Sequence, residues 1–198
     1  MVNFSDYQFA KVMDYPEDSD ELYLFDFSKG YDADFIRKKG WGIGRYDEYR
    51  TNMYETSLFK NERNLHIGID IWAEAGEPIY NVYDGTVEYI RDNDNPGDYG
   101  PTIVMKHKFA EGMLYVLYGH LSEASLQMVS KGDQIPKGRK IATLGTPDVN
   151  GGWAPHLHFQ LSVIDPGKAD MPGVVAPEDR DQALEQYPDP RLVLGKLY

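Results

Sequence analysis

Short runs of β-forming residues recur along the chain from residue 65 onward. They are rich in Val, Ile, Tyr and Thr, and Gly, Pro, Asn or Asp separates them about every ten residues. This pattern is typical of antiparallel strands joined by tight turns. We therefore predict a mainly β domain whose strands cover 66–71, 85–91, 102–107, 113–118, 140–144 and 156–164.

Helical signal is sparse and is strongest near the C-terminus. Pro177 is followed by Glu178 and Asp179, and Pro188 lies past the expected end of the segment. Proline and acidic residues favour the first turn of a helix, and a proline beyond the last turn ends it. The sequence therefore predicts one short helix over 177–187.

The first 43 residues differ in pattern from the rest of the chain. An acidic run is followed by LYLFDF at 22–27, whose alternation predicts a short strand. Glycines at 40, 42 and 44 then predict a loop over 40–54. We divide the chain into an N-terminal extension of strand and loop, 1–43, and a main domain, 44–198, with a short C-terminal helix.

Composition narrows the possible chemistry and partners. The chain of 198 residues contains no Cys, so disulfides, thiol nucleophiles and Cys-ligated metals are excluded and any metal must bind to His and carboxylates. At this length one domain is the default expectation. The net charge of −12 argues against nucleic acid or a membrane surface as a partner, because those surfaces require clustered basic residues.

The sequence shows no targeting or membrane-spanning segment. No apolar stretch approaches the ~20 residues that cross a bilayer, and the N-terminal residues lack the basic and apolar regions of a signal peptide. The sequence as written predicts a cytoplasmic location. If a leader has been removed, the protein would instead be periplasmic or secreted.

Two short motifs place histidines where a metal site could form. In HIGID, His66 and Asp70 would lie ~13 Å apart on a straight strand, but Gly68 between them allows the chain to bend. In HLH, His156 and His158 share one face of a strand at ~7 Å. That spacing suits one metal ligand and one neighbouring acid–base group.

The remaining two histidines have different settings. His120 lies in YGHL, just after a predicted strand end. His107 lies among lysines in TIVMKHK, and we interpret it as a surface or hydrogen-bonded structural residue. Each motif is short enough to arise by chance. Their joint presence, in this order in one small chain, is what predicts a site.

A wider set of motifs connects these histidines. The set consists of HIGID at 66–70, YDGTV at 83–87, YGHLS at 118–122, VSKGDQIPKGRKI at 129–141 and PHLHFQL at 155–161. In this set the chain resembles the lysostaphin-type zinc metallopeptidases, bacterial enzymes that cleave peptide cross-links in peptidoglycan. The resemblance implies their fold, a two-layer antiparallel β-sandwich of the duplicated hybrid motif type with few short helices.

A closer resemblance runs over residues 44–194. GRYDEYRTNMY, LYGHLSEASL and NGGWAPHLHFQL are similar to the metallopeptidase-like domain found between sugar-kinase-like and aminotransferase-like domains in some large bacterial proteins. That branch implies a cytosolic member whose natural substrate need not be peptidoglycan.

The resemblance also implies roles for the site residues. By motif, His66, Asp70 and His158 would bind one Zn²⁺ per chain. His120 and His156 would be the acid–base pair beside the metal. Two His and one carboxylate leave a fourth tetrahedral position open, as in catalytic zinc sites, where zinc lowers the pKa of water towards ~7. The expected activity is that of a zinc-dependent endopeptidase or amide hydrolase acting on peptidoglycan-like or other small-residue peptides.

Two features depart from the family pattern. The segment 145–155 before HLH is longer and bulkier than usual, and Trp153 beside the site would reshape the substrate groove. Family members often support the oxyanion with a tyrosine upstream of the first histidine. Tyr46, Tyr49 and Tyr54 are candidates here, and the sequence assigns none of them.

Several alternatives stay open at this point. A non-hydrolytic, zinc-containing ligand-binding module of the same fold is the main one, and a phosphocarrier with paired histidines is a weaker one. The acid in the HIGID motif favours a metal over a phosphocarrier. The expected partner is a peptide or peptidoglycan fragment, with no nucleic acid and no membrane; the oligomeric state and the choice of general base are not determined.

Overall fold

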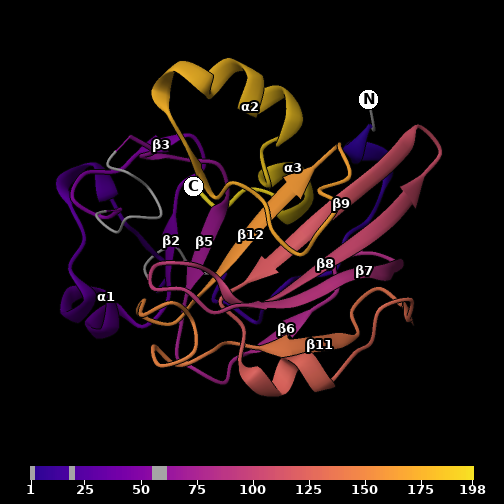
Figure 1. Ribbon diagram of the computed structural model, residues 1–198, viewed down its shortest axis with the longest axis horizontal. Helices are drawn as coiled ribbons and strands as arrows, with labels where there is room; N and C mark the ends of the chain where they lie inside the picture. The colour runs from indigo at the N-terminus through magenta and orange to yellow at the C-terminus, as the bar shows by residue number, and fades with distance from the viewer. Residues whose placement is uncertain (1–2, 18–20, 55–61) are drawn as a thin grey trace.

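An eight-stranded sheet forms the centre of the computed structural model, which describes residues 3–17, 21–54 and 62–198. Its pairs are antiparallel except for the edge pair β1–β2, which is parallel. The larger strands lie side by side in one twisted sheet (Figure 1). In spatial order the strands are β1 (Tyr23–Leu24), β2 (Gly42–Gly44), β5 (Ile69–Trp72), β12 (His156–Ser162), β9 (Gly112–Gly119), β8 (Gly100–Phe109), β7 (Gly85–Asn93) and β10 (Gln134–Ile135).

Two small sheets and several short helices surround the large sheet. One small sheet pairs β6 (Pro78–Tyr80) with β11 (Lys140–Thr143), and the other orders β13 (Val174–Val175), β4 (Leu65–His66) and β3 (Glu48–Tyr49). The α-helices are α1 (Ala33–Lys39), α2 (Arg180–Gln186) and α3 (Arg191–Leu194). The 3-10 helices are η1 (Phe4–Asp6), η2 (Phe27–Lys29), η3 (Glu123–Gln127) and η4 (Pro177–Asp179).

The predicted mainly β architecture with few short helices is confirmed. Strands lie in all the expected ranges, but the one expected over 66–71 is broken into β4 and β5, and the one expected over 22–27 is only the two residues of β1. The predicted helix over 177–187 is η4 followed by α2. Among the helices of the described residues, none has the length and apolar character needed to cross a membrane. The division at residue 43 stays a prediction, and residues 1–2 and 18–20 of the predicted extension lie outside the described residues.

The predicted loop over 40–54 is wrong in two places, because Gly42–Gly44 forms strand β2 against β5 and Glu48–Tyr49 forms strand β3 against β4. A Cβ at Gly42 would lie 2.2 Å from the ring of Phe25. The glycine therefore permits close packing inside a strand, and does not mark a turn. Helix α1 was also not predicted, although Asp32 caps it by accepting from the amides of Asp34 and Phe35.

Strand alternation gives the large sheet two chemically different faces. Ile69 and Ile71 of β5 and Phe159 of β12 point into the main apolar core. The intervening residues Asp70 and His158 point to the opposite face. Residues of β6, β11 and the N-terminal segment complete the core, so the candidate site residues occupy the face away from it.

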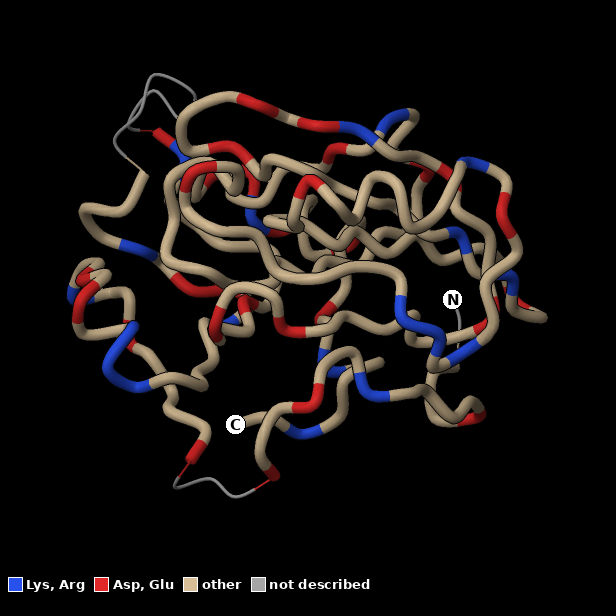
Figure 2. The backbone as a smooth tube through the Cα atoms, turned by 90° about the horizontal axis from the view of Figure 1, so that it is seen from below, with Lys and Arg blue, Asp and Glu red and all other residues tan. Residues whose placement is uncertain are grey.

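Acidic and basic positions are spread around the whole molecule (Figure 2). The acidic residues, whose excess produces the net charge of −12, are therefore not gathered on one side of the molecule in this view.

Candidate metal centre

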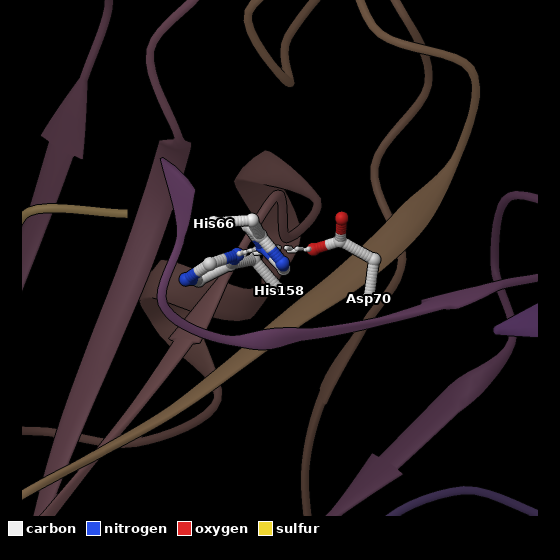
Figure 3. A group of neighbouring side chains, drawn as sticks. All are labelled: His66, Asp70 and His158. Atoms are coloured by element: carbon white, nitrogen blue, oxygen red, sulfur yellow. Dashed lines mark hydrogen bonds and ion pairs between the residues drawn. The ribbon is translucent and has the colours of Figure 1, made fainter. Parts of the chain in front are cut away.

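Three donor atoms converge at the predicted metal site. His66 Nε2 lies 3.3 Å from Asp70 Oδ1, His158 Nδ1 lies 3.0 Å from the same oxygen, and the two nitrogens are 3.2 Å apart. All three side chains are buried. Figure 3 shows the two imidazoles and the carboxylate pointing toward one another. Within the described residues, this is the group of His and carboxylate side chains that could hold a metal ion.

Strand register and one glycine bring these residues together. Asp70 of β5 lies directly opposite His158 of β12, so their side chains are cross-strand neighbours on one face. His66 ends β4, and the chain breaks at Ile67 and Gly68 before β5 begins. A Cβ at Gly68 would lie 2.5 Å from the His158 ring. The bend expected in HIGID is therefore present, and glycine is required there by the close approach of the imidazole.

Hydrogen bonds to the outer atoms orient both imidazoles. His66 Nδ1 lies 2.7 Å from the carbonyl oxygen of Arg45, which accepts, and 2.9 Å from Arg50 Nη2, which donates. His158 Nε2 lies 2.9 Å from Gln160 Oε1, and the amide nitrogen of Gln160 donates to Pro172 O. These contacts turn His66 Nε2 and His158 Nδ1 into the gap beside Asp70, where both nitrogens could bind a metal ion.

The charges at the centre also fit a metal site. Burial, together with the nearby Arg50 cation, lowers the pKa of His66 to about 4. Burial would raise the pKa of Asp70, but its interactions with His66, Arg50 and His158 hold this pKa well below its usual range. At neutral pH His66 is therefore neutral and Asp70 is ionised, the forms that bind metal.

The two predicted acid–base histidines lie beside the metal site. The ring centroids of His120 and His156 are 4.1 Å apart, and His120 is 6.3 Å from His158. His120 Nδ1 bonds to the carbonyl of Asn150 at 2.9 Å and His156 Nδ1 to that of Ala154 at 2.8 Å. Each Nδ1 therefore carries a proton, and each Nε2 is left with a lone pair.

Burial keeps both of these imidazoles neutral. It lowers the pKa of His156 to about 4, and it lowers the pKa of His120 well below its usual value. His156 also stacks on Trp72 with 3.9 Å between ring centroids. The structure thus brings all five predicted site residues together, and their individual roles stay predictions.

His107 lies elsewhere and agrees with its structural interpretation. It is buried in β8, and its Nδ1 bonds to the carbonyl of Asp84 at 3.1 Å. Burial lowers its pKa to about 4.

Arg50 is a site residue that sequence reasoning missed. It is only 2% exposed, and its Nη1 donates to Asp70 Oδ2 at 2.7 Å and to the hydroxyl of Tyr54 at 2.8 Å. Its Nε donates to Glu48 at 3.3 Å, and its guanidinium lies over the Phe27 ring. The surrounding GRYDEYR segment reads as a polar loop, so no sequence signal indicated a buried arginine.

Of the three tyrosines considered as supports for the oxyanion, only one lies at the site. Tyr54 lines the cavity above the site, Tyr46 donates its hydroxyl to the carbonyl of Tyr187, and Tyr49 is 47% exposed. Tyr99, which the sequence did not single out, places its hydroxyl 3.5 Å from His158 Nε2. Two tyrosines therefore lie at the site, and only one of them precedes the first histidine.

A cavity of about 420 Å³ opens over these residues. The five site residues and Arg50 line it together with apolar and aromatic side chains from several segments. A buried His–Asp–His group with two further neutral histidines, facing a cavity on one side of an antiparallel sheet, defines a candidate site of metal-dependent hydrolysis.

The comparisons with known proteins agree with this class. The model of Peptidase family M23 matches residues 64–170, more than half of the chain. The chain belongs to peptidase family M23.

Two curated relatives are similar to parts of the chain. An uncharacterized metalloprotease of Haemophilus influenzae is 28% identical over 146 residues, which is 68% of this chain and 28% of the relative. The peptidoglycan DD-endopeptidase ShyA of Vibrio cholerae is 34% identical over 113 residues, which is 54% of this chain and 23% of that protein. The chain thus aligns with less than a third of the length of either relative.

Solved structures with a similar arrangement include two peptidases. The catalytic domain of lysostaphin from Staphylococcus simulans has a TM-score of 0.47 at 19% identity, covering 77% of this chain and 98% of that domain. A zinc containing peptidase from Vibrio cholerae has a TM-score of 0.44 at 29% identity, covering 65% of this chain and 39% of that one.

Proposed function

We propose that the chain is a zinc-dependent endopeptidase or amide hydrolase that cleaves peptide bonds in peptidoglycan-like or other small-residue peptides. The observation that carries the proposal is the convergence of His66 Nε2, Asp70 Oδ1 and His158 Nδ1 within 3.3 Å of one another. Membership of peptidase family M23 and the similarity to a peptidoglycan DD-endopeptidase support the choice of substrate class.

The donor set fits one zinc ion per chain. Tetrahedral zinc with bonds of ~2.0–2.1 Å to nitrogen and oxygen holds its donors about 3.3 Å apart, which agrees with the separations of 3.0 to 3.3 Å seen here. When bound, zinc would supply Lewis-acid polarisation of the scissile carbonyl and acidification of water.

Protein groups would handle the protons of the reaction. The Nε2 lone pairs of His120 and His156 are the available bases, because each Nδ1 is occupied by a backbone carbonyl. One imidazole would take a proton from the attacking water, and an imidazolium would deliver a proton to the leaving amine. Both histidines are buried and bond through Nδ1 to a backbone carbonyl. The choice between them as general base therefore stays open.

Turnover by single variants tests the proposal. With zinc supplied, His120→Ala should bind the metal and lose about 10²–10⁴-fold in kcat on a panel of peptidoglycan fragments and small peptides. His107→Ala is the matched control, because it removes a buried imidazole outside the site. Full activity of His120→Ala would refute the assigned mechanism. Absence of turnover by the wild type on the whole panel would favour the alternative of a non-hydrolytic zinc-containing binding module.

We also propose that the chain belongs to the branch whose members lie between kinase-like and aminotransferase-like domains. The support is the sequence similarity at 44–54 and 150–161, and this branch makes cytosolic peptides part of the substrate panel. The cytoplasmic location expected from the sequence stays a prediction, which localisation of the tagged full-length protein in its own cells would test.

A further inference from the structure

The cavity over the site is large, and apolar and aromatic side chains form part of its lining. Its volume of about 420 Å³ lies within the ~300–1,000 Å³ of pockets that enclose drug-sized ligands. Two separate apolar clusters reach it. Met53, Tyr54 and Trp153 belong to one, and Tyr99 and Met171 belong to the other.

Trp153 is held in place by contacts from three parts of the chain. Its indole Nε1 donates to Gly97 O at 3.3 Å, and its backbone amide donates to Asn150 Oδ1 at 3.0 Å. The rings of Tyr31 and Tyr54 lie 5.6 and 6.0 Å from the Trp153 ring. A ring restrained in this way loses little conformational freedom when a ligand packs on it.

The same loop also holds the two acid–base candidates. The carbonyl of Asn150 bonds to His120, and the carbonyl of Ala154 bonds to His156. The amide of Ala154 in turn donates to the hydroxyl of Tyr31 at 3.0 Å. Trp153 lies between these two carbonyls in the chain, and its side chain lines the same cavity as His120 and His156. A group packed on Trp153 would therefore share this cavity with the bond that the histidines act on.

We propose that Met53, Tyr54 and Trp153 form a specificity subsite for a large apolar or aromatic side chain beside the scissile bond. This inference rests on the proposed function. A thioether and two aromatic rings present apolar surface, and methionine adapts to ligands of different shape. Burial of an apolar side chain on this surface favours binding, whereas glycine leaves the surface in contact with water.

Matched peptides test the subsite. The probes are N-acetylated pentaglycine and its variants with Leu or Phe at each single position, assayed for turnover by zinc-loaded wild-type protein and for binding by zinc-loaded His120→Ala protein. We expect one position at which Leu or Phe raises kcat/KM and lowers Kd at least about tenfold relative to glycine. In Trp153→Ala this ratio should fall to near one, whereas Trp41→Ala, which removes an indole outside the cavity, should keep the ratio.

The two arms separate this inference from the proposed function. Equal binding of the glycine, Leu and Phe peptides by His120→Ala would overturn the subsite, and so would a preference that Trp153→Ala retains. A Trp153-dependent binding preference without turnover of any peptide would support the subsite and contradict the hydrolase.

Discussion

At the scale of single residues, Arg50 explains how a buried carboxylate stays ionised at the site. Its guanidinium contacts Asp70 Oδ2 and Glu48, and the Arg50 and Asp70 side chains are 1% and 2% exposed. A charge buried without a partner is strongly destabilising. Arg50 therefore both stabilises the fold and leaves Asp70 Oδ1 directed at the metal position.

Replacement of Arg50 measures this role. Arg50→Met should lower the free energy of unfolding of the metal-free protein by roughly 3–5 kcal/mol, because it leaves Asp70 without its partner. Urea unfolding provides the measurement. Arg45→Met is the matched control: Arg45 is 35% exposed and lies 3.6 Å from Glu48, so its loss should cost at most about 1 kcal/mol. Similar losses in the two variants would contradict the account.

The buried imidazoles predict how stability depends on pH. Burial lowers the pKa of His66 and of His156 to about 4, whereas an unfolded histidine titrates near ~6.5. Between these values the unfolded state binds more protons, so stability falls as the pH falls. Urea unfolding of the metal-free protein should show a constant free energy above pH 7 and a loss of up to about 1.4 kcal/mol per pH unit for each such histidine from pH 6.5 to 4. A flat profile from pH 7 to 5 would contradict it.

Site residues could be predicted from the sequence where they lie in short motifs of fixed spacing. HIGID, YGHL and HLH identified five side chains that the structure brings together. Arg50 and Tyr99 were not predicted as site residues, because their contacts depend on how distant segments of the chain pack. A local sequence pattern does not indicate such packing.

At the scale of elements, the break between β4 and β5 is what makes the site. The expected continuous strand over 66–71 is interrupted at Gly68, since a Cβ there would meet His158 at 2.5 Å. The strand pairing of β5 with β12 then sets Asp70 opposite His158. The sequence indicated the bend through glycine, but the register of two strands nearly ninety residues apart is a tertiary property.

A methyl group added at Gly68 tests whether the break between β4 and β5 positions the metal ligands. Gly68→Ala should displace the His158 ring and weaken zinc binding at least about tenfold, since misplaced ligands and their neighbours typically cost 10–100-fold in metal affinity. Competition with a chelator measures the affinity, and circular dichroism checks that the β fold is kept. Ile67→Val, a small change in a neighbouring side chain that packs in a separate apolar cluster, is the control. Unchanged affinity in Gly68→Ala would contradict the steric argument.

At the scale of the whole molecule, the two faces of the large sheet have different roles. One face packs in the main core, and the other carries the metal centre. The N-terminal segment belongs to the core side: Val12 and Met13 are fully buried, and Tyr80 N donates to Val12 O. The mainly β class could be predicted from the spacing of the turns. The packing of the N-terminal segment could not, because this segment contacts residues far along the chain.

Removal of residues 1–16 tests this separation. The shortened chain should lose several kcal/mol of stability, because burial of each large apolar side chain contributes ~1.5–3 kcal/mol, and should still bind zinc with wild-type stoichiometry below its unfolding temperature. Thermal unfolding and zinc analysis provide the measurements. A full-length chain with Lys11→Ala, which changes a side chain of the same segment that is 44% exposed, is the control. Loss of zinc from the folded, shortened chain would show that the two faces are coupled.

The most direct test is the zinc content per chain of the wild type and of five single alanine variants after dialysis against a weak chelator. We expect one zinc in the wild type, in His120→Ala and in His156→Ala, and none in His66→Ala, Asp70→Ala or His158→Ala. Zinc retained at wild-type affinity by any of the last three, or lost from His120→Ala while that variant stays folded, would contradict the assignment of the metal centre.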